Sequence, residues 1–339
     1  MKLKKLFYFF INEIKFSIWI KVIINFIIQS VVIISELLFL STFFLILNQS
    51  TNSNLLNIFV NNLNKYILPF FESFSQVEFY ILVLIFFLVV KNIMIIVQNI
   101  YYQKFMFKLT AEKSAQVLQS YMDKSFDIFS KVEISIYVKQ LVKDVENVFI
   151  GIFGLAVSFI GEIIYAGFLI YFVSHLIDFT PTIEVFVLLG LISLIIYLLF
   201  LLAKKFGEVR ASSEIKVFKT LSDTLNIFKE IKLIEGAHHF VSRYQNFLIK
   251  YYKSRIGSSI INISPKFMFE LFVLTLFFVI YKSESSDLSI TDFIIKYSTF
   301  AVAMLRLIPS FARLSSYSSM MLYNLNSIKF IKDDLNKRK

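Results

Sequence analysis

The sequence predicts an all-α integral membrane protein with six transmembrane helices and long cytoplasmic extensions. Hydrophobic residues make up 57% of the 339 residues and charged residues only 17%, and the mean hydropathy is +0.70, which is typical of membrane-embedded chains. From Phe70 to Ile150 the chain has neither glycine nor proline, the residues that usually mark turns. An apolar segment there runs without interruption into charged sequence, so we expect a helix that crosses the bilayer and projects into water. A second apolar segment likewise runs into charged sequence over 203–255.

Six segments have the length and apolar character of membrane spans, which need roughly 20 residues. The first apolar stretch is too long for the hydrophobic region of a removable signal peptide. The six predicted spans are about 17–47, 79–101, 148–173, 183–203, 258–281 and 293–313.

The distribution of Lys and Arg predicts the orientation. The short connections 48–78, 174–184 and 281–292 hold only Lys65 and Lys282, whereas the N-terminus, the two long hairpins and the C-terminal segment together hold 26. Cytoplasmic segments carry such an excess of basic residues. Both termini and both hairpins are therefore predicted to be cytoplasmic, in a multi-pass protein of a bacterial-type inner (plasma) membrane. This topology also accounts for the formal charge of +11, so no nucleic acid partner is expected.

The predicted elements differ in how far they extend beyond the membrane. A helix from 79 to about 124 would be roughly 70 Å long at about 1.5 Å per residue. We expect the first hairpin to turn within 123–131 and the second near 208–219. The third span also carries a stripe of small residues that predicts close packing against another helix: Gly151, Gly154, Ser158 and Gly161.

Several classes of chemistry are not expected. The sequence has no Cys, so it forms no disulfide and offers no thiolate ligand for zinc or an iron–sulfur cluster. The three His lack a carboxylate partner at ligand spacing, and the phosphate-binding pattern G-x-x-x-x-G-K-[ST] and a Ser/His/Asp set are both missing. We therefore expect no metal, no cofactor and no enzymatic activity of this chain alone.

Ionisable side chains inside the apolar spans are the strongest functional signal, because they are costly in lipid and usually face an interior, a partner or a water-filled cavity. In one interpretation these charges neutralise one another between helices. In the other, which we favour, the cations line a path for an anionic substrate, because guanidinium groups match phosphate geometry. The cations are Lys91, Lys266, Arg306 and Arg313, and the acids that are their possible partners are Glu36, Glu162 and Glu270.

Spacing adds detail to this set of charges. Arg306 and Arg313 share one face of the last span, about 10 Å apart along the helix axis. Pro309 between them predicts a kink. Lys266 and Glu270 are four residues apart and are able to pair on one helix.

Four stretches stand out by their order and spacing: KNIM at 91–94, TLNIFKEIKL at 224–233, Pro265-Lys266 with Glu270, and LRLIPSFAR at 305–313. Together they resemble the transmembrane domain of ABC exporters, most of all that of the PglK-type lipid-linked oligosaccharide flippases. The similarity covers most of the chain and is strongest from about 220 to 335. The resemblance implies the type IV (ABC type-1) exporter fold over residues 1–335.

The family resemblance also implies partners. ABC exporters of this type are dimers with the fourth and fifth helices exchanged, so a homodimer is expected. A nucleotide-binding domain, with ATP and Mg²⁺, follows the membrane domain in the family, but only the basic tail 336–339 stands at that point here. We therefore expect the ATPase domain on a separate chain or beyond this sequence. The hairpin tips would couple to it through Phe126, Asp127 and Phe129 in the first and Ser212, Glu214 and Ile215 in the second.

The resemblance further implies a substrate. Cations of the family's cavity handle the substrate pyrophosphate, and Lys266, Arg306 and Arg313 fall on those positions, while Lys91 stands where the similar sequence has Arg. The predicted function is the transmembrane module of an ATP-driven exporter that flips a lipid-linked oligosaccharide or a similar anionic, amphipathic substrate. The alternatives are a peptide or drug exporter of the same fold, and a non-transporting half-transporter scaffold that regulates a partner.

Overall fold

The structure, a computed structural model, describes residues 16–47, 76–130, 132–176, 183–284 and 290–336. Its described residues are almost entirely helical, which confirms the prediction of an all-α protein. The elements are α2 (Phe16–Leu47), α4 (Gln76–Met122), α5 (Phe126–Phe129), α6 (Ile134–Lys139), η2 (Gln140–Asp144), α7 (Val145–Val148), η3 (Phe149–Gly154), α8 (Leu155–Leu176), α9 (Ile183–Asn226), α10 (Phe228–Leu233), α11 (Ala237–Glu284) and α12 (Ile290–Asn336).

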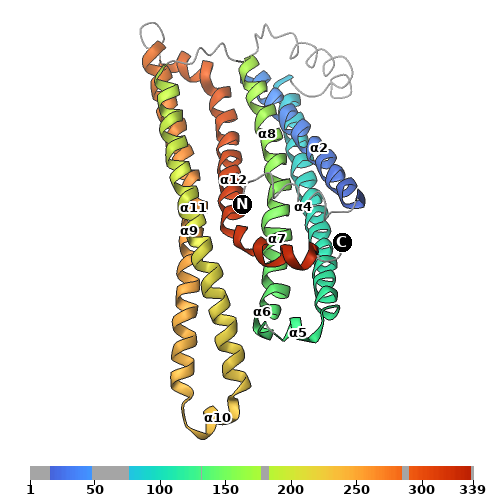
Figure 1. Ribbon diagram of the computed structural model, residues 1–339. Coiled ribbons are helices and arrows are strands. Elements are labelled where there is room, and N and C mark those ends of the chain that lie inside the picture. Colours follow the sequence, from blue (N-terminus) through green and yellow to red (C-terminus); the bar gives the residue numbers. More distant parts are fainter. Residues whose placement is uncertain (1–15, 48–75, 131, 177–182, 285–289, 337–339) are drawn as a thin grey trace.

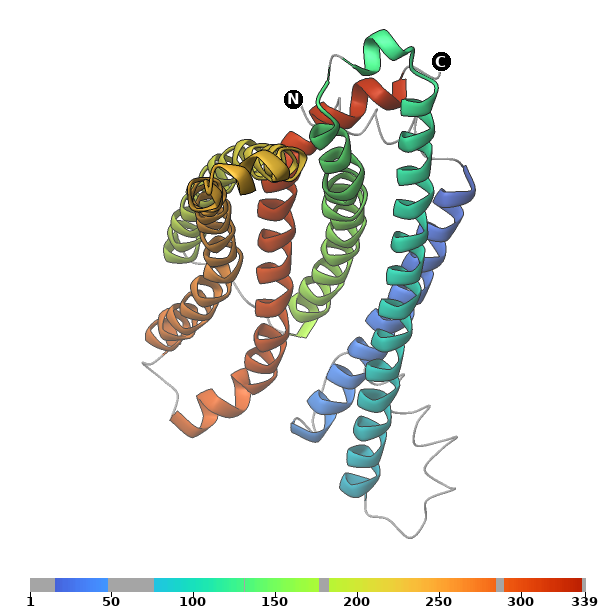
Figure 2. The same cartoon turned by 90° about the horizontal axis from the view of Figure 1, so that it is seen from below.

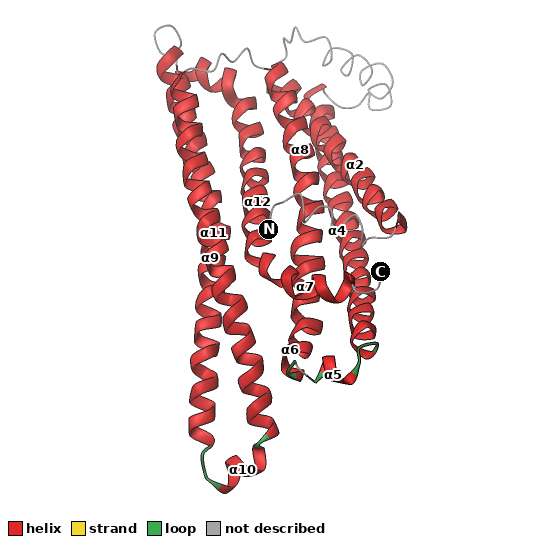
Figure 3. Ribbon diagram, in the orientation of Figure 1, coloured by secondary structure: helices red, strands yellow, loops and turns green. Residues whose placement is uncertain are grey.

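The long helices run roughly side by side in two groups (Figures 1 and 2). In one group α2 packs along α4, and in the other α9 packs along α11. The helix α12 contacts α9 and α11 as well as α8, α2 and α4, so it joins the two groups. The loops of the described chain lie at the far ends of the hairpins, around α5 and α10 (Figure 3).

Four helical segments are long and apolar enough to cross a membrane: Phe16–Phe43, Glu78–Met122, Ile134–Tyr171 and Ala237–Lys282. They contain four of the six predicted spans, and they identify a membrane-embedded protein. Many of their large apolar side chains point outward, among them Phe86, Leu274 and Phe278, as contact with lipid requires. Part of the side chains in the predicted spans 183–203 and 293–313 lies outside the described residues, so the number of six spans stays a prediction.

The first hairpin follows the expected course. One continuous helix, α4, extends to Met122, and the short helix α5 lies within the predicted tip. The returning helix is interrupted twice by π-helical segments, η2 and η3. Such segments widen the helix locally and often occur at functional sites.

The predicted tip of the second hairpin is wrong. Residues 208–219 lie inside the continuous helix α9, and the turn comes later, around α10. Polar residues of 208–219, including Arg210 and Glu214, are buried against neighbouring helices rather than solvated. The reversal instead uses Glu235, whose φ of 51° is the left-handed conformation that ends many helices.

Small residues allow close helix contacts, as the sequence predicted for the third span. A Cβ atom at Gly151 would lie 2.5 Å from Asn324 Nδ2, and one at Gly154 would lie 2.7 Å from the hydroxyl of Tyr102. Around this seam a core cluster forms from α2, α4, the returning helix and α12, with residues such as Leu109, Val117, Val145, Phe149 and Ile328.

Gly207→Ala should loosen the contact between α9 and α12. A Cβ at Gly207 would lie 2.5 Å from the backbone oxygen of Tyr323, and a backbone atom cannot rotate away. We expect a loss of about 1–3 kcal/mol in the free energy of unfolding, measured by unfolding the protein in detergent. The matched control is Gly167→Ala, because nothing lies within 4 Å of a Cβ there and helix propensity favours Ala by about 1 kcal/mol. Equal effects of the two substitutions would show that the α9–α12 contact is not tight.

Candidate functional site

The ionisable residues of the predicted spans come together across four helices. Glu36 of α2, whose side chain is only 1% exposed, contacts Lys91 of α4 and Arg306 of α12. The distance from Arg306 Nε to Glu36 Oε1 is 3.3 Å, and the guanidinium also lies 5.0 Å from the ring centre of Phe39. One buried carboxylate therefore holds two cations.

A second ion pair joins α8 to α12. Arg313 donates a hydrogen bond from Nη2 to Glu162 Oε1 over 2.7 Å. The Glu162 side chain is 10% exposed, whereas that of Arg313 is 46% exposed. The acid is thus buried between the helices while much of the guanidinium faces the surroundings.

Lys266 and Glu270 pair within α11, as their spacing predicted, at 3.8 Å. Both side chains are about half exposed, and such pairs contribute little to stability. Among the ion pairs of the described chain, none joins Lys266 to Glu36 or Glu162. The structure therefore brings together three of the four predicted cations and leaves Lys266 with its own partner.

These contacts bear on both interpretations of the charges. Each predicted cation has an acidic partner, and three of those pairs join different helices, which the sequence could not show because it contains no inter-helix distances. The pairing is nevertheless unequal in number. Among the described residues, three cations (Lys91, Arg306, Arg313) contact two acids (Glu36, Glu162), so the cations of this group outnumber the acids by one.

The residues predicted to couple to an ATPase lie in two different settings. In α5, Phe126 and Asp127 are exposed at the end of the first hairpin, while Phe129 stacks on Tyr137 with ring centres 4.7 Å apart. Ser212, Glu214 and Ile215 instead lie along the shaft of α9. The second tip carries exposed apolar residues that the sequence analysis did not select, chiefly Leu233 (83% exposed) and Ile234.

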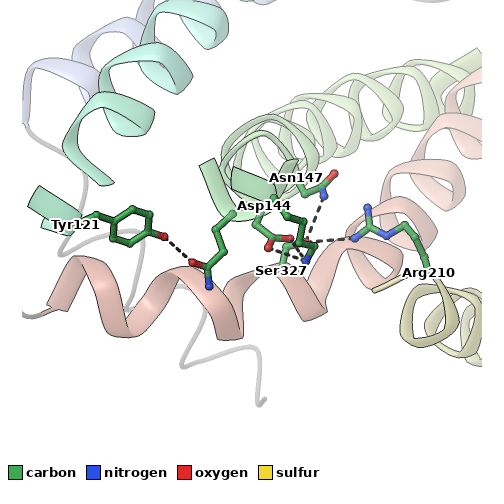
Figure 4. A network of polar contacts seen from close by, with 7 residues as sticks. Tyr121, Asp144, Asn147, Arg210 and Ser327 are labelled. Atoms are coloured by element: carbon green, nitrogen blue, oxygen red, sulfur yellow. Dashed lines mark hydrogen bonds and ion pairs between the residues drawn. The ribbon is translucent and has the colours of Figure 1, made fainter. Parts of the chain in front are cut away.

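A buried ion pair that the sequence analysis missed holds the returning helix of the first hairpin. Lys139 Nζ contacts both carboxylate oxygens of Asp144, at 2.7 and 3.0 Å, and both side chains are at most 1% exposed. Lys139 precedes the π-helical turn η2 and Asp144 is its last residue, so the ion pair spans the turn. Beside them, the hydroxyl of Tyr121 donates to Gln140 Oε1 over 2.7 Å, which ties η2 to α4 (Figure 4).

Next to this pair, Ser327 connects three helices (Figure 4). Its hydroxyl oxygen accepts hydrogen bonds from Asn147 Nδ2 of α7 and from Arg210 Nη2 of α9, each over 3.3 Å. Because Ser327 belongs to α12, a shift of α9 relative to the first hairpin would have to break one of these bonds.

No cluster of three or more His, Cys, Asp or Glu suited to a metal ion occurs among the described residues. In comparisons with protein-family models and with curated proteins, no match to this chain was found.

Proposed function

We propose that this chain is the transmembrane module of an ATP-driven ABC exporter that flips a lipid-linked oligosaccharide or a similar anionic, amphipathic substrate. It would act as a homodimer of six-span subunits with an ABC nucleotide-binding domain outside this sequence, which would bind ATP and Mg²⁺. The observation that carries the proposal is the positive charge in excess at Lys91, Arg306 and Arg313, held by only two acids. Unbalanced charge is costly in a membrane and is retained where it serves a function.

The geometry of the two arginines supports an anionic substrate. A guanidinium has five N–H donors. Arg306 contacts Glu36 through Nε and Arg313 contacts Glu162 through Nη2, so each ion pair leaves other donors for a phosphate. The side chains are 34% and 46% exposed, which gives a ligand access to them. The acids would thus orient the arginines without saturating them.

Lipid flipping by reconstituted protein tests this role. With the ATPase partner present in proteoliposomes, Arg306→Gln should abolish flipping of a pyrophosphate-linked lipid but leave folding nearly intact, because Glu36 keeps its contact with Lys91. The matched control is Arg243→Gln, since Arg243 is exposed on α11 beyond the predicted span, and it should flip normally. Normal flipping by Arg306→Gln and by the double variant with Arg313→Gln would reject the proposed substrate site.

The hairpin ends are the proposed docking points for the ATPase domain. They project away from the body of the protein, and the α9–α11 hairpin extends beyond the first (Figure 1). Phe126 at one end and Leu233 and Ile234 at the other expose large apolar side chains, as surfaces that bind a partner protein do.

Cysteine labelling tests the docking points without background, because the natural sequence has no Cys. Ile234→Cys should react with a membrane-impermeant maleimide from the cytoplasmic side, and binding of the ATPase partner should suppress the reaction. Leu221→Cys, exposed on the shaft of α9, should label equally with and without the partner. Unchanged labelling of Ile234→Cys with the partner demonstrably bound would make α10 an ordinary solvated turn.

The scaffold alternative is favoured by one observation, the pairing of each predicted cation with an acid. If the charges only hold helices together, the reconstituted protein should assemble with a partner but flip no lipid. The same proteoliposome assay on the unaltered chain therefore separates the two functions.

A further inference from the structure

A polar cavity of about 400 Å³ lies where the returning helix of the first hairpin meets α9, α11 and α12. Its volume falls within the range of small-molecule sites, about 300–1,000 Å³. It shares no residue with the ion pairs of Glu36 and Glu162. Its lining is mostly polar: Lys143, Glu146, Asn147, Ile150, Gly151, Arg210, Glu214, Tyr251, Arg255, Ser258, Ser259, Asn262, Met320, Tyr323 and Asn324.

Arg210 is a preorganised cation in this cavity. The residue is only 4% exposed, and its guanidinium is fixed by the hydrogen bond to Ser327 and by the ring of Tyr323, whose centre lies 4.6 Å away. Its Nε atom is buried and has no hydrogen-bond partner among the described residues. A buried, charged donor without a partner is unfavourable, and the charge of an anion in the cavity would offset part of that cost.

Glu214 supplies an acceptor one helical turn further along α9. It is 3% exposed, and its Oε2 atom has no hydrogen-bond partner in the described part of the chain. Burial raises the pKa of this carboxyl group above its ordinary value, and the charge of Arg210 partly offsets that effect. A cationic and an acidic side chain of α9 thus line the cavity one helical turn apart.

The remaining charges leave the cavity positive. Lys143 and Glu146 lie 3.8 Å apart and offset each other at the rim, so Arg210 and Arg255 outnumber Glu214. The amide of Asn324 lies close to the π-helical segment η3, where it donates to the carbonyl oxygen of Gly151 over 3.3 Å. An anion with several hydroxyl groups matches this combination of cations, carboxylate and amides.

We propose that this cavity binds a hydroxyl-bearing phosphate ester, such as a sugar phosphate or the sugar-phosphate headgroup of a lipid. The phosphate lies against Arg210 and Arg255, and a hydroxyl donates to Glu214. The site touches α7, η3, α9, α11 and α12 at once, so its ligand stabilises one relative position of the two hairpins. Binding at this cavity needs only this chain, so it is independent of the export function.

Calorimetric titration of the purified full chain with glucose 1-phosphate tests the site. We expect saturable binding that is at least about tenfold tighter than that of inorganic phosphate or of glucose. Titration in nanodiscs of phosphatidylinositol and of phosphatidylcholine separates the two sources of the ligand. If the apparent affinity for glucose 1-phosphate is lower only in the phosphatidylinositol nanodiscs, the ligand of the cavity is a lipid headgroup. If the affinity is equal in both kinds of nanodisc, the ligand is a free sugar phosphate.

Three substitutions make the test specific. Ser259→Asp adds a carboxylate at an exposed position of the cavity lining, so it should weaken binding by about tenfold or more without unfolding the chain. Asn226→Asp adds the same charge on an exposed part of α9 outside the cavity and should bind normally. Glu214→Ala should reduce the affinity for glucose 1-phosphate to that for inorganic phosphate. Equal affinities of the unaltered chain for all three solutes, or equal losses in both Asp variants, would overturn the proposal.

Discussion

Glu36→Gln should destabilise the protein by about 3–5 kcal/mol, the cost of removing one partner from a buried ion pair. Glu36 is 1% exposed and is the carboxylate between Lys91 and Arg306. Its loss leaves two positive charges facing each other within apolar helices, with no counter-charge from α2. The change is measured as the free energy of unfolding in detergent.

The matched control for this result is Glu270→Gln. The Lys266–Glu270 pair has the same chemistry, but both side chains are about half exposed, so its removal should cost clearly less than that of the fully buried Glu36. Adding Lys91→Met to Glu36→Gln should recover much of the lost stability, because it removes one of the two repelling cations. A Glu36→Gln variant as stable as Glu270→Gln would mean that Glu36 does not hold the three helices together.

Much of the fold follows from the sequence because the signals are local. Long helices could be located from apolar runs of span length and from the absence of glycine and proline between 70 and 150. The position of α4 confirms this prediction. The ionisable residues could be identified for the same reason, since a charge in an apolar run is rare. The acids could be named as possible partners, and the Lys266–Glu270 pair followed from its spacing. Which acid meets which cation across helices could not be predicted, because residues such as Glu36 and Arg306 lie on helices far apart in the chain.

The error at the second hairpin has a physical cause. A segment rich in Ser, Glu, Lys and Arg looks like a solvated turn, but the same residues suit a helix that buries a polar face. Arg210, Ser213 and Glu214 are such buried residues. The real turn carries Leu233 and Ile234, whose exposed apolar side chains give no turn signal in the sequence.

The π-helical segments could not be predicted from the sequence either. Side chains three or four residues apart meet on an α-helix, whereas Lys139 and Asp144 are five apart and still form an ion pair. The wider turn of η2 makes this contact possible. A search for helical ion pairs at α-helical spacing therefore cannot find it.

Asp144→Asn should destabilise the first hairpin by about 3–5 kcal/mol. Both Lys139 and Asp144 are at most 1% exposed, so the substitution takes away the charge that balances Lys139 in a buried place. It also removes the contact that closes η2, so we expect the hydrogen bond from Tyr121 to Gln140 to weaken and amide hydrogen exchange over 134–148 to accelerate. The unfolding free energy and the exchange rates measure the two effects.

Glu146→Gln is the matched control for Asp144→Asn. Its ion pair with Lys143 is only a few residues away, but it is long, at 3.8 Å, and both side chains are about half exposed, so the change should stay within about 0.5 kcal/mol. Combining Asp144→Asn with Lys139→Met removes both members of the pair and should restore most of the stability, while exchange over η2 stays fast. If Asp144→Asn alone were as stable as Glu146→Gln, the buried pair would contribute nothing to the hairpin, and η2 would owe its shape to backbone packing alone.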